Sequence, residues 1–134
     1  MRAVLADTSY FGALLSPKDE LHPAAVEWAR SGQRPIVVTE FVLIELGNGF
    51  HLPRDRELFR GFVEELLADP NVTVIPASPE LFRAGLDLYG TRLDKEWSLT
   101  DCMSLVVMEE RGLTEALTAD HHFEQAGFKA LLQR

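Results

Sequence analysis

The sequence predicts a three-layer α/β/α fold, in which helices cover both faces of a short, mostly parallel sheet of four to five strands. Short apolar and β-branched runs alternate with longer segments of helical periodicity along the whole chain, a pattern typical of parallel sheets with crossover helices. The chain has 134 residues and is 46% hydrophobic, which fits one globular domain. We therefore expect residues 1–134 to form a single α/β domain.

Four short runs have the composition of buried strands, and a fifth has that of an edge strand. The first run, Ala3 to Ala6, is apolar and stops at the carboxylate of Asp7. The next two are rich in β-branched residues, which favour strands. The expected strands are residues 3–6, 35–38, 72–75 and 116–119, with 128–132 as a candidate edge strand.

The segments between these runs have helical periodicity and recognisable ends. Ser16-Pro17 ends the first helix, because the residue before a proline disfavours helical angles. The helix that opens at Ser98 is apolar nearly all round, so we expect it to be the central buried helix. The expected helices are residues 8–15, 22–31, 40–47, 53–69, 79–93 and 99–111, with a short helix or turn at 121–125. In the helix over 79–93, four residues are expected to point inward: Leu81, Phe82, Leu86 and Tyr89.

Composition limits the possible functions. The formal net charge is −8, which argues against a generic phosphate-binding surface, because nonspecific nucleic-acid affinity comes from clustered Lys and Arg. The single cysteine, Cys102, forms no internal disulfide and is expected to be a buried structural thiol. No signal-peptide or membrane-spanning pattern is found, so we expect a cytoplasmic protein.

Four acidic residues stand out by position. Asp7 and Asp120 each follow a strand and precede a helix, and Asp101 opens the most apolar helix. Glu45 lies within an otherwise apolar helical stretch. Ligands of open α/β sheets bind outside the carboxyl ends of the strands, and hard cations such as Mg²⁺ and Mn²⁺ take carboxylate oxygens. Four convergent carboxylates would hold one or two such ions for phosphodiester hydrolysis.

Each acid also has a purely structural interpretation. Asp7 and Asp120 have the position of helix N-caps, and Asp101 lies three residues after Ser98, as the acid of a capping box does. Taken singly, these three are more often structural. Glu45 is either turned inward, where it needs a cation or a protonated state, or exposed on a half-exposed helix.

Other polar residues lie beside the acids. Thr8, Ser9 and Thr118 are placed to orient a carboxylate, a water or a phosphate oxygen, with helix capping as the alternative for Ser9. His121 and His122 are weaker candidates for substrate contact, because adjacent histidines in a polar turn are usually solvated. They also lack the i, i+4 spacing of a zinc helix.

The chain resembles the PIN-domain ribonucleases, in particular the VapC-like toxins of prokaryotic toxin–antitoxin pairs. The matching segments, in order, are residues 5–9, 39–46, 97–102 and 117–123. By this resemblance Asp7, Glu45, Asp101 and Asp120 are the metal-binding and catalytic acids, and Thr8, Ser9 and Thr118 are the hydroxyls beside them. The resemblance also implies an RNA substrate, Mg²⁺ or Mn²⁺ as cofactor, a homodimer and a small inhibitory antitoxin.

Other functions fit the sequence less well. Position 9 is Ser, whereas a haloacid-dehalogenase-like site requires a second Asp there. The acidic pair and late lysine of a receiver domain are not evident, and P-loop and dinucleotide fingerprints are absent. A non-catalytic RNA-binding or protein-interaction module on the same fold, and a housekeeping RNA-processing nuclease, remain the alternatives.

Overall fold

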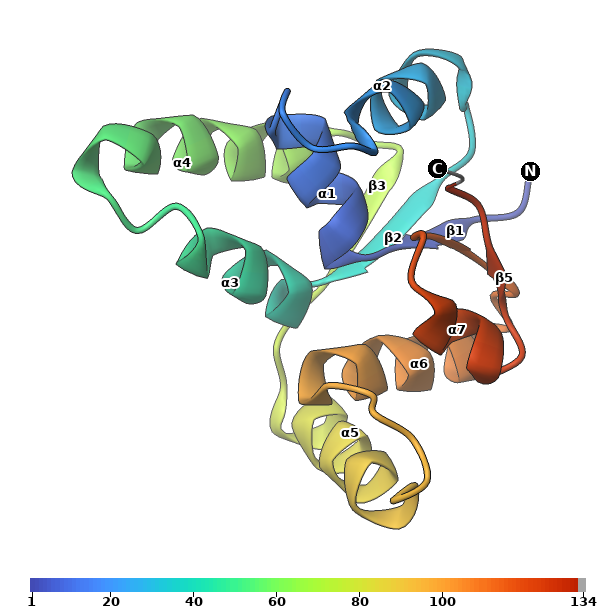
Figure 1. The fold of residues 1–134 in the computed structure, drawn as a ribbon. Coiled ribbons are helices and arrows are strands. Elements are labelled where there is room, and N and C mark those ends of the chain that lie inside the picture. Colours follow the sequence, from blue (N-terminus) through green and yellow to red (C-terminus); the bar gives the residue numbers. More distant parts are fainter. Residues whose placement is uncertain (133–134) are drawn as a thin grey trace.

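The computed structural model describes residues 1–132 and is built around a five-stranded sheet in the order β3-β2-β1-β4-β5, with every pairing parallel (Figure 1). The strands are β1 (Val4–Ala6), β2 (Ile36–Thr39), β3 (Val72–Ile75), β4 (Glu115–Leu117) and β5 (Lys129–Ala130). All five lie within one or two residues of the expected runs, and the expected edge strand is indeed at one end of the sheet.

Seven helices connect the strands within the described residues. They are α1 (Thr8–Leu15), α2 (His22–Ser31), α3 (Glu40–Asn48), α4 (Pro53–Ala68), α5 (Pro79–Thr91), α6 (Leu99–Arg111) and α7 (His121–Gln125). Among residues 1–132, no helix is long and apolar enough to cross a membrane.

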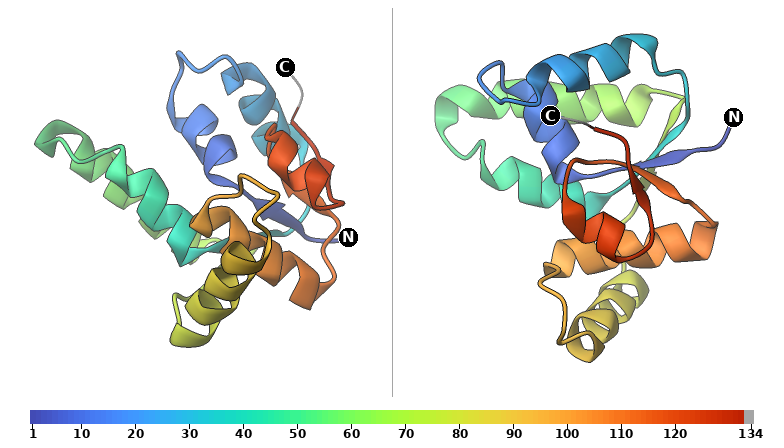
Figure 2. Two further views of the ribbon diagram at one scale, coloured as in Figure 1. Left: turned by 60° about the horizontal axis from the view of Figure 1, so that its bottom comes forward. Right: turned by 45° about the vertical axis from the view of Figure 1, so that its right-hand side comes forward.

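The helices form one layer on each face of the sheet, as expected. Successive residues of β1 point to opposite faces, so Val4 and Ala6 pack with α1, α2 and α3, while Leu5 packs with α5, α6 and α7. Figure 2 shows α5 and α6 lying together, away from α1 and α2. Helix α6 has six buried residues, which confirms that it is a central buried helix.

The register of the sheet brings two strand ends together. Ala6 of β1 pairs with Leu117 of β4, and the Asp7 backbone amide donates to the Leu117 carbonyl at 3.3 Å. Asp7 and Thr118 therefore leave the sheet side by side at its carboxyl edge.

The inward face expected for α5 was right at Leu81 and wrong at Phe82 and Tyr89. Phe82 is 43% exposed and Tyr89 is 51% exposed, whereas Leu81 and Gly85 are the buried positions. A Cβ at Gly85 would press on Met103 of α6, so the two helices approach closely at this glycine. That close approach turns the face around Gly85 inward and leaves Phe82 and Tyr89 facing outward.

Candidate active site

Asp7 is a buried carboxylate with two hydroxyl donors. It is 5% exposed, and its Oδ2 accepts hydrogen bonds from Ser9 Oγ and Thr118 Oγ1, both at 3.0 Å. Although Asp7 occupies the N-cap position of α1, its side chain makes no capping hydrogen bond. The capping interpretation is therefore wrong for Asp7, and so is the capping alternative for Ser9, whose hydroxyl turns back to the carboxylate.

The surroundings of Asp7 favour its protonated form. Burial, followed by the negative charge of Asp101, raises its pKa from 3.8 to about 6, while the hydrogen bonds from Ser9 and Thr118 act in the opposite direction. A nearby cation would reverse this balance, because it stabilises the charged carboxylate.

Asp101 lies close enough to the other three acids to interact electrostatically with each of them. Its pKa is raised by burial and by the negative charges of Asp120 and Glu45, and its own charge raises the pKa of Asp7. Asp101 also forms the expected capping box. Its Oδ2 accepts from the Ser98 amide at 3.1 Å, and its own amide donates to Ser98 Oγ at 3.0 Å. Capping therefore fixes the orientation of this carboxylate within the acidic cluster.

Glu45 is exposed, so the alternative in which its side chain turns into the core is wrong. Its carboxylate nevertheless lies against α1, where Thr8 Oγ1 donates to Oε1 at 2.6 Å. The apolar stretch around it is explained by burial of Val42, Leu43 and Leu46, while Ile44 shares the exposed side with Glu45. Glu45 thus reaches the cluster from its solvent-facing side.

Asp120 caps α7 and contacts both neighbouring histidines. Its Oδ1 accepts from the His122 amide at 2.9 Å, as the capping interpretation requires. The same oxygen lies 2.9 Å from His122 Nδ1 and 3.7 Å from His121 Nδ1. His122 Nδ1 is also 4.0 Å from Asp101 Oδ2, so His122 lies between two of the acids.

Thr118 joins the two strand-end acids. It is fully buried, donates to Asp7 Oδ2 at 3.0 Å and accepts from the Asp120 amide at 2.9 Å. One hydroxyl thereby sets the position of the carboxylate that follows β1 and of the turn that follows β4.

The structure brings all four sequence-predicted acids and all three hydroxyls into one connected group. Sequence reasoning gave too little weight to His122, whose side chain is only 22% exposed. Its signal was adjacency to Asp120, which the search for an i, i+4 histidine pair does not detect. Cys102 is buried and free, as expected.

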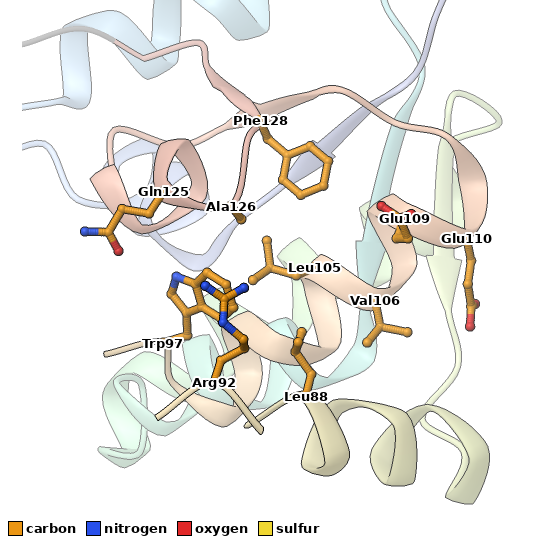
Figure 3. A pocket seen from close by; sticks show the side chains of 10 residues that line it. All are labelled: Leu88, Arg92, Trp97, Leu105, Val106, Glu109, Glu110, Gln125, Ala126 and Phe128. Atoms are coloured by element: carbon orange, nitrogen blue, oxygen red, sulfur yellow. The ribbon is translucent and has the colours of Figure 1, made fainter. Parts of the chain in front are cut away.

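A separate cavity of about 480 Å³ lies between α5, α6 and the segment after α7 (Figure 3). Its lining is mainly apolar and includes Leu105 and Phe128, and none of the four acids belongs to it. Trp97, which lines the cavity, links it to the acidic group, because its Nε1 donates to the His122 carbonyl at 3.1 Å. The acidic group and this cavity are therefore neighbouring but distinct features.

Comparison with known proteins gives the family. Residues 4–129 match the model of the PIN domain, and the chain belongs to the PIN domain family. A search of curated proteins finds no match.

Two solved structures show the same fold. One is VapC20 of Mycobacterium tuberculosis, a toxin that cleaves the sarcin–ricin loop; it has a TM-score of 0.85 and 22% identity, over 97% of this chain and 99% of that one. FitAcB of Neisseria gonorrhoeae has a TM-score of 0.65 and 19% identity, over 97% and 96%. The expected PIN-type fold is therefore confirmed.

Proposed function

We propose that this protein is a divalent-metal-dependent endoribonuclease that hydrolyses RNA phosphodiester bonds. Asp7, Glu45, Asp101 and Asp120 would bind one or two Mg²⁺ or Mn²⁺ ions. The observation that carries the proposal is the buried carboxylate of Asp7, which two hydroxyls orient beside three further acids. Membership of the PIN domain family supports it.

The donor set fits a hard divalent cation. Mg²⁺ and Mn²⁺ prefer carboxylate oxygens, and four carboxylates lie in one connected group. Without a cation, burial and then the repulsion between the acids raise the pKa values of Asp7 and Asp101, so a cation would relieve a cost that the fold otherwise carries. When bound, the ion would activate a water molecule and stabilise charge on the phosphate.

The residues of the chain have different tasks in this proposal. Asp7, which is buried, would set the position of the cation, and Ser9 and Thr118 hold its Oδ2 by hydrogen bonds. Thr8 fixes Glu45, which faces solvent and is therefore accessible to an incoming RNA strand. Asp101 and Asp120 are each held by a capping hydrogen bond.

We further propose that the chain is one domain that acts in the cytoplasm as the toxin of a toxin–antitoxin pair. The fold likeness to VapC20, a sarcin–ricin-loop-cleaving toxin, supports this role over that of a housekeeping nuclease. The proposal includes a small antitoxin protein that inhibits the enzyme, and a homodimer. With a net charge of −8, the chain has no overall excess of basic residues, so RNA would be bound by a local basic strip or across a dimer.

The test is RNA cleavage by purified, partner-free protein with and without Mn²⁺ or Mg²⁺. Wild type should cleave only with metal, and Asp7→Asn and Asp101→Asn should each lose at least about 100-fold in rate, a barrier increase of ~2.7 kcal/mol. Equal cleavage by wild type and both variants, or none by wild type on any RNA, would reject the nuclease. A folded, RNA-binding but inactive wild type would favour the non-catalytic module.

A further inference from the structure

We propose that Asp120, His121 and His122 form a binding site for a divalent transition-metal ion such as Zn²⁺, at the edge of the acidic group. One oxygen of Asp120 and one nitrogen from each imidazole all lie within 4.8 Å of one another. The inference goes beyond the proposed nuclease and shares only Asp120 with it.

The distances suit one shared ion. The Oδ1 atom of Asp120 lies 2.9 Å from His122 Nδ1 and 3.7 Å from His121 Nδ1, and the two rings are 4.4 Å apart between centroids. Zinc bonds nitrogen and oxygen at about 2.0–2.2 Å, so two ligands of a tetrahedral ion lie roughly 3–4 Å apart. Small side-chain rotations would bring all three atoms to such an ion.

A second observation points to a ligand at this position. The Nδ1 atom of His122 is buried and lies 2.9 Å from Asp120 Oδ1, but in an orientation that forms no hydrogen bond with it or with any other described residue. Buried polar atoms are nearly always satisfied. A metal ion would accept the lone pair of a neutral imidazole here and balance the charge of Asp120.

The surrounding structure holds this donor set in place. The His122 amide donates to Asp120 Oδ1 at 2.9 Å, and the His122 carbonyl accepts from Trp97 Nε1 at 3.1 Å. The His121 side chain is 69% exposed, which leaves one side open for an ion to enter and for water to complete its coordination.

The chemistry of the donor atoms distinguishes this site from the Mg²⁺ or Mn²⁺ site proposed for the four acids. Imidazole suits Zn²⁺ and other transition metals, whereas Mg²⁺ requires oxygen ligands. Two imidazoles and one carboxylate therefore predict a site that Zn²⁺ occupies and Mg²⁺ does not.

The test uses tag-free, chelator-treated, ¹⁵N-labelled protein and NMR of the imidazole nitrogens. The chain contains four histidines. One equivalent of Zn²⁺ should give the Nδ1 signals of His121 and His122 the large shift of a metal-bound imidazole nitrogen and leave those of His22 and His51 unchanged. Mg²⁺, which binds oxygen, should produce no such coordination shift at any histidine. Absence of any imidazole shift with Zn²⁺, or shifts at all four histidines alike, would overturn the site.

Calorimetry of variants gives an independent measurement. His121→Ala and His122→Ala should each weaken Zn²⁺ binding at least roughly tenfold, with His51→Ala as the matched control that binds as wild type does. Unchanged Zn²⁺ affinity in both site variants would refute the inference. Asp7→Asn separates the two proposals, because it should abolish RNA cleavage and leave the imidazole shifts intact. If wild type cleaves no RNA but shows the shifts, the nuclease fails and this site stands.

Discussion

Asp7 is an unusual residue for a folded protein, because carboxylates are almost never fully buried without a partner. Within the described residues its side chain has hydroxyl donors, from Ser9 and Thr118, and no ion pair with a cationic side chain. Hydrogen bonds from neutral donors offset burial only in part, since its pKa stays raised at about 6. The fold thus maintains a costly group at the end of β1, which is the pattern expected of a functional rather than a structural carboxylate.

The raised pKa predicts how stability changes with pH in the metal-free protein. The unfolded chain releases the Asp7 proton near pH 3.8, but the folded protein holds it until about pH 6. Between these values the free energy of unfolding falls as pH rises, and above about pH 6 the loss is complete, at ~3 kcal/mol. Asp7→Asn removes this titration. We expect the variant to melt several degrees higher than wild type at about pH 7.5, and to differ little near pH 4.

Thermal unfolding in chelator, in steps from about pH 4 to 8, measures this difference. If wild type and Asp7→Asn show parallel curves, Asp7 is not the source of the pH dependence.

Thr118 predicts a second effect at the residue scale. Thr118→Val keeps the shape of the side chain but removes a donor to Asp7 and leaves the Asp120 amide without its acceptor. We expect a loss of about 1–3 kcal/mol in the free energy of unfolding. The pH profile of RNA cleavage should also move to higher pH, because the charged form of Asp7 loses a hydrogen bond.

Urea unfolding and the pH–rate profile measure these two effects. Ser104→Ala is the matched control, since the Ser104 hydroxyl is equally buried but has no hydrogen-bond partner among the described residues. Equal effects of the two substitutions would mean that the network around Thr118 has no special role.

At the scale of secondary-structure elements, the sequence predicts the strands and the placement of the acids well, because both depend on local patterns. A buried apolar run that stops at an acid marks the end of a parallel strand, and parallel strands end at a common edge. The convergence of Asp7 with Asp120 follows from that geometry. The exposure of Glu45 and the buried face of α5 could not be predicted in the same way, because they depend on how closely neighbouring helices approach.

The contact between α5 and α6 carries its own prediction. In an exposed helix, Gly→Ala stabilises by about 1 kcal/mol. At Gly85 the added Cβ would press on the Met103 side chain and lie 3.3 Å from the Met103 backbone nitrogen. We expect Gly85→Ala to lower the free energy of unfolding by roughly 1–3 kcal/mol instead.

Gly61 of α4 is the control, because an added Cβ there meets nothing within 4 Å. Gly61→Ala should therefore raise stability in the same urea titration. A stabilising Gly85→Ala would contradict the close approach of α5 and α6.

At the scale of the whole molecule, the sheet order places β1 between β2 and β4. The crossover helices α1 and α3 follow β1 and β2, so Thr8 and Glu45 meet although 37 residues separate them. The predicted fold class is consistent with this contact, because helices that follow neighbouring parallel strands begin at the same edge of the sheet. Adjacency to Asp120 was visible in the sequence, but the position of His122 beside Asp101 was not predictable, because it depends on the positions of both α6 and α7. The resemblance to the PIN domain was correct because its four segments lie in the right order across the chain.

The central claim is that the four acids act together as a cation site, and Mn²⁺ binding measured by calorimetry tests it most directly. Asp101→Asn retains an oxygen for the capping hydrogen bond but removes the negative charge that lies near the other three acids. Ser104→Ala serves as the control. We predict that wild type and Ser104→Ala bind Mn²⁺ alike, and that Asp101→Asn binds at least roughly tenfold more weakly, a difference of ~1.4 kcal/mol. The same Mn²⁺ affinity in all three proteins would contradict the claim.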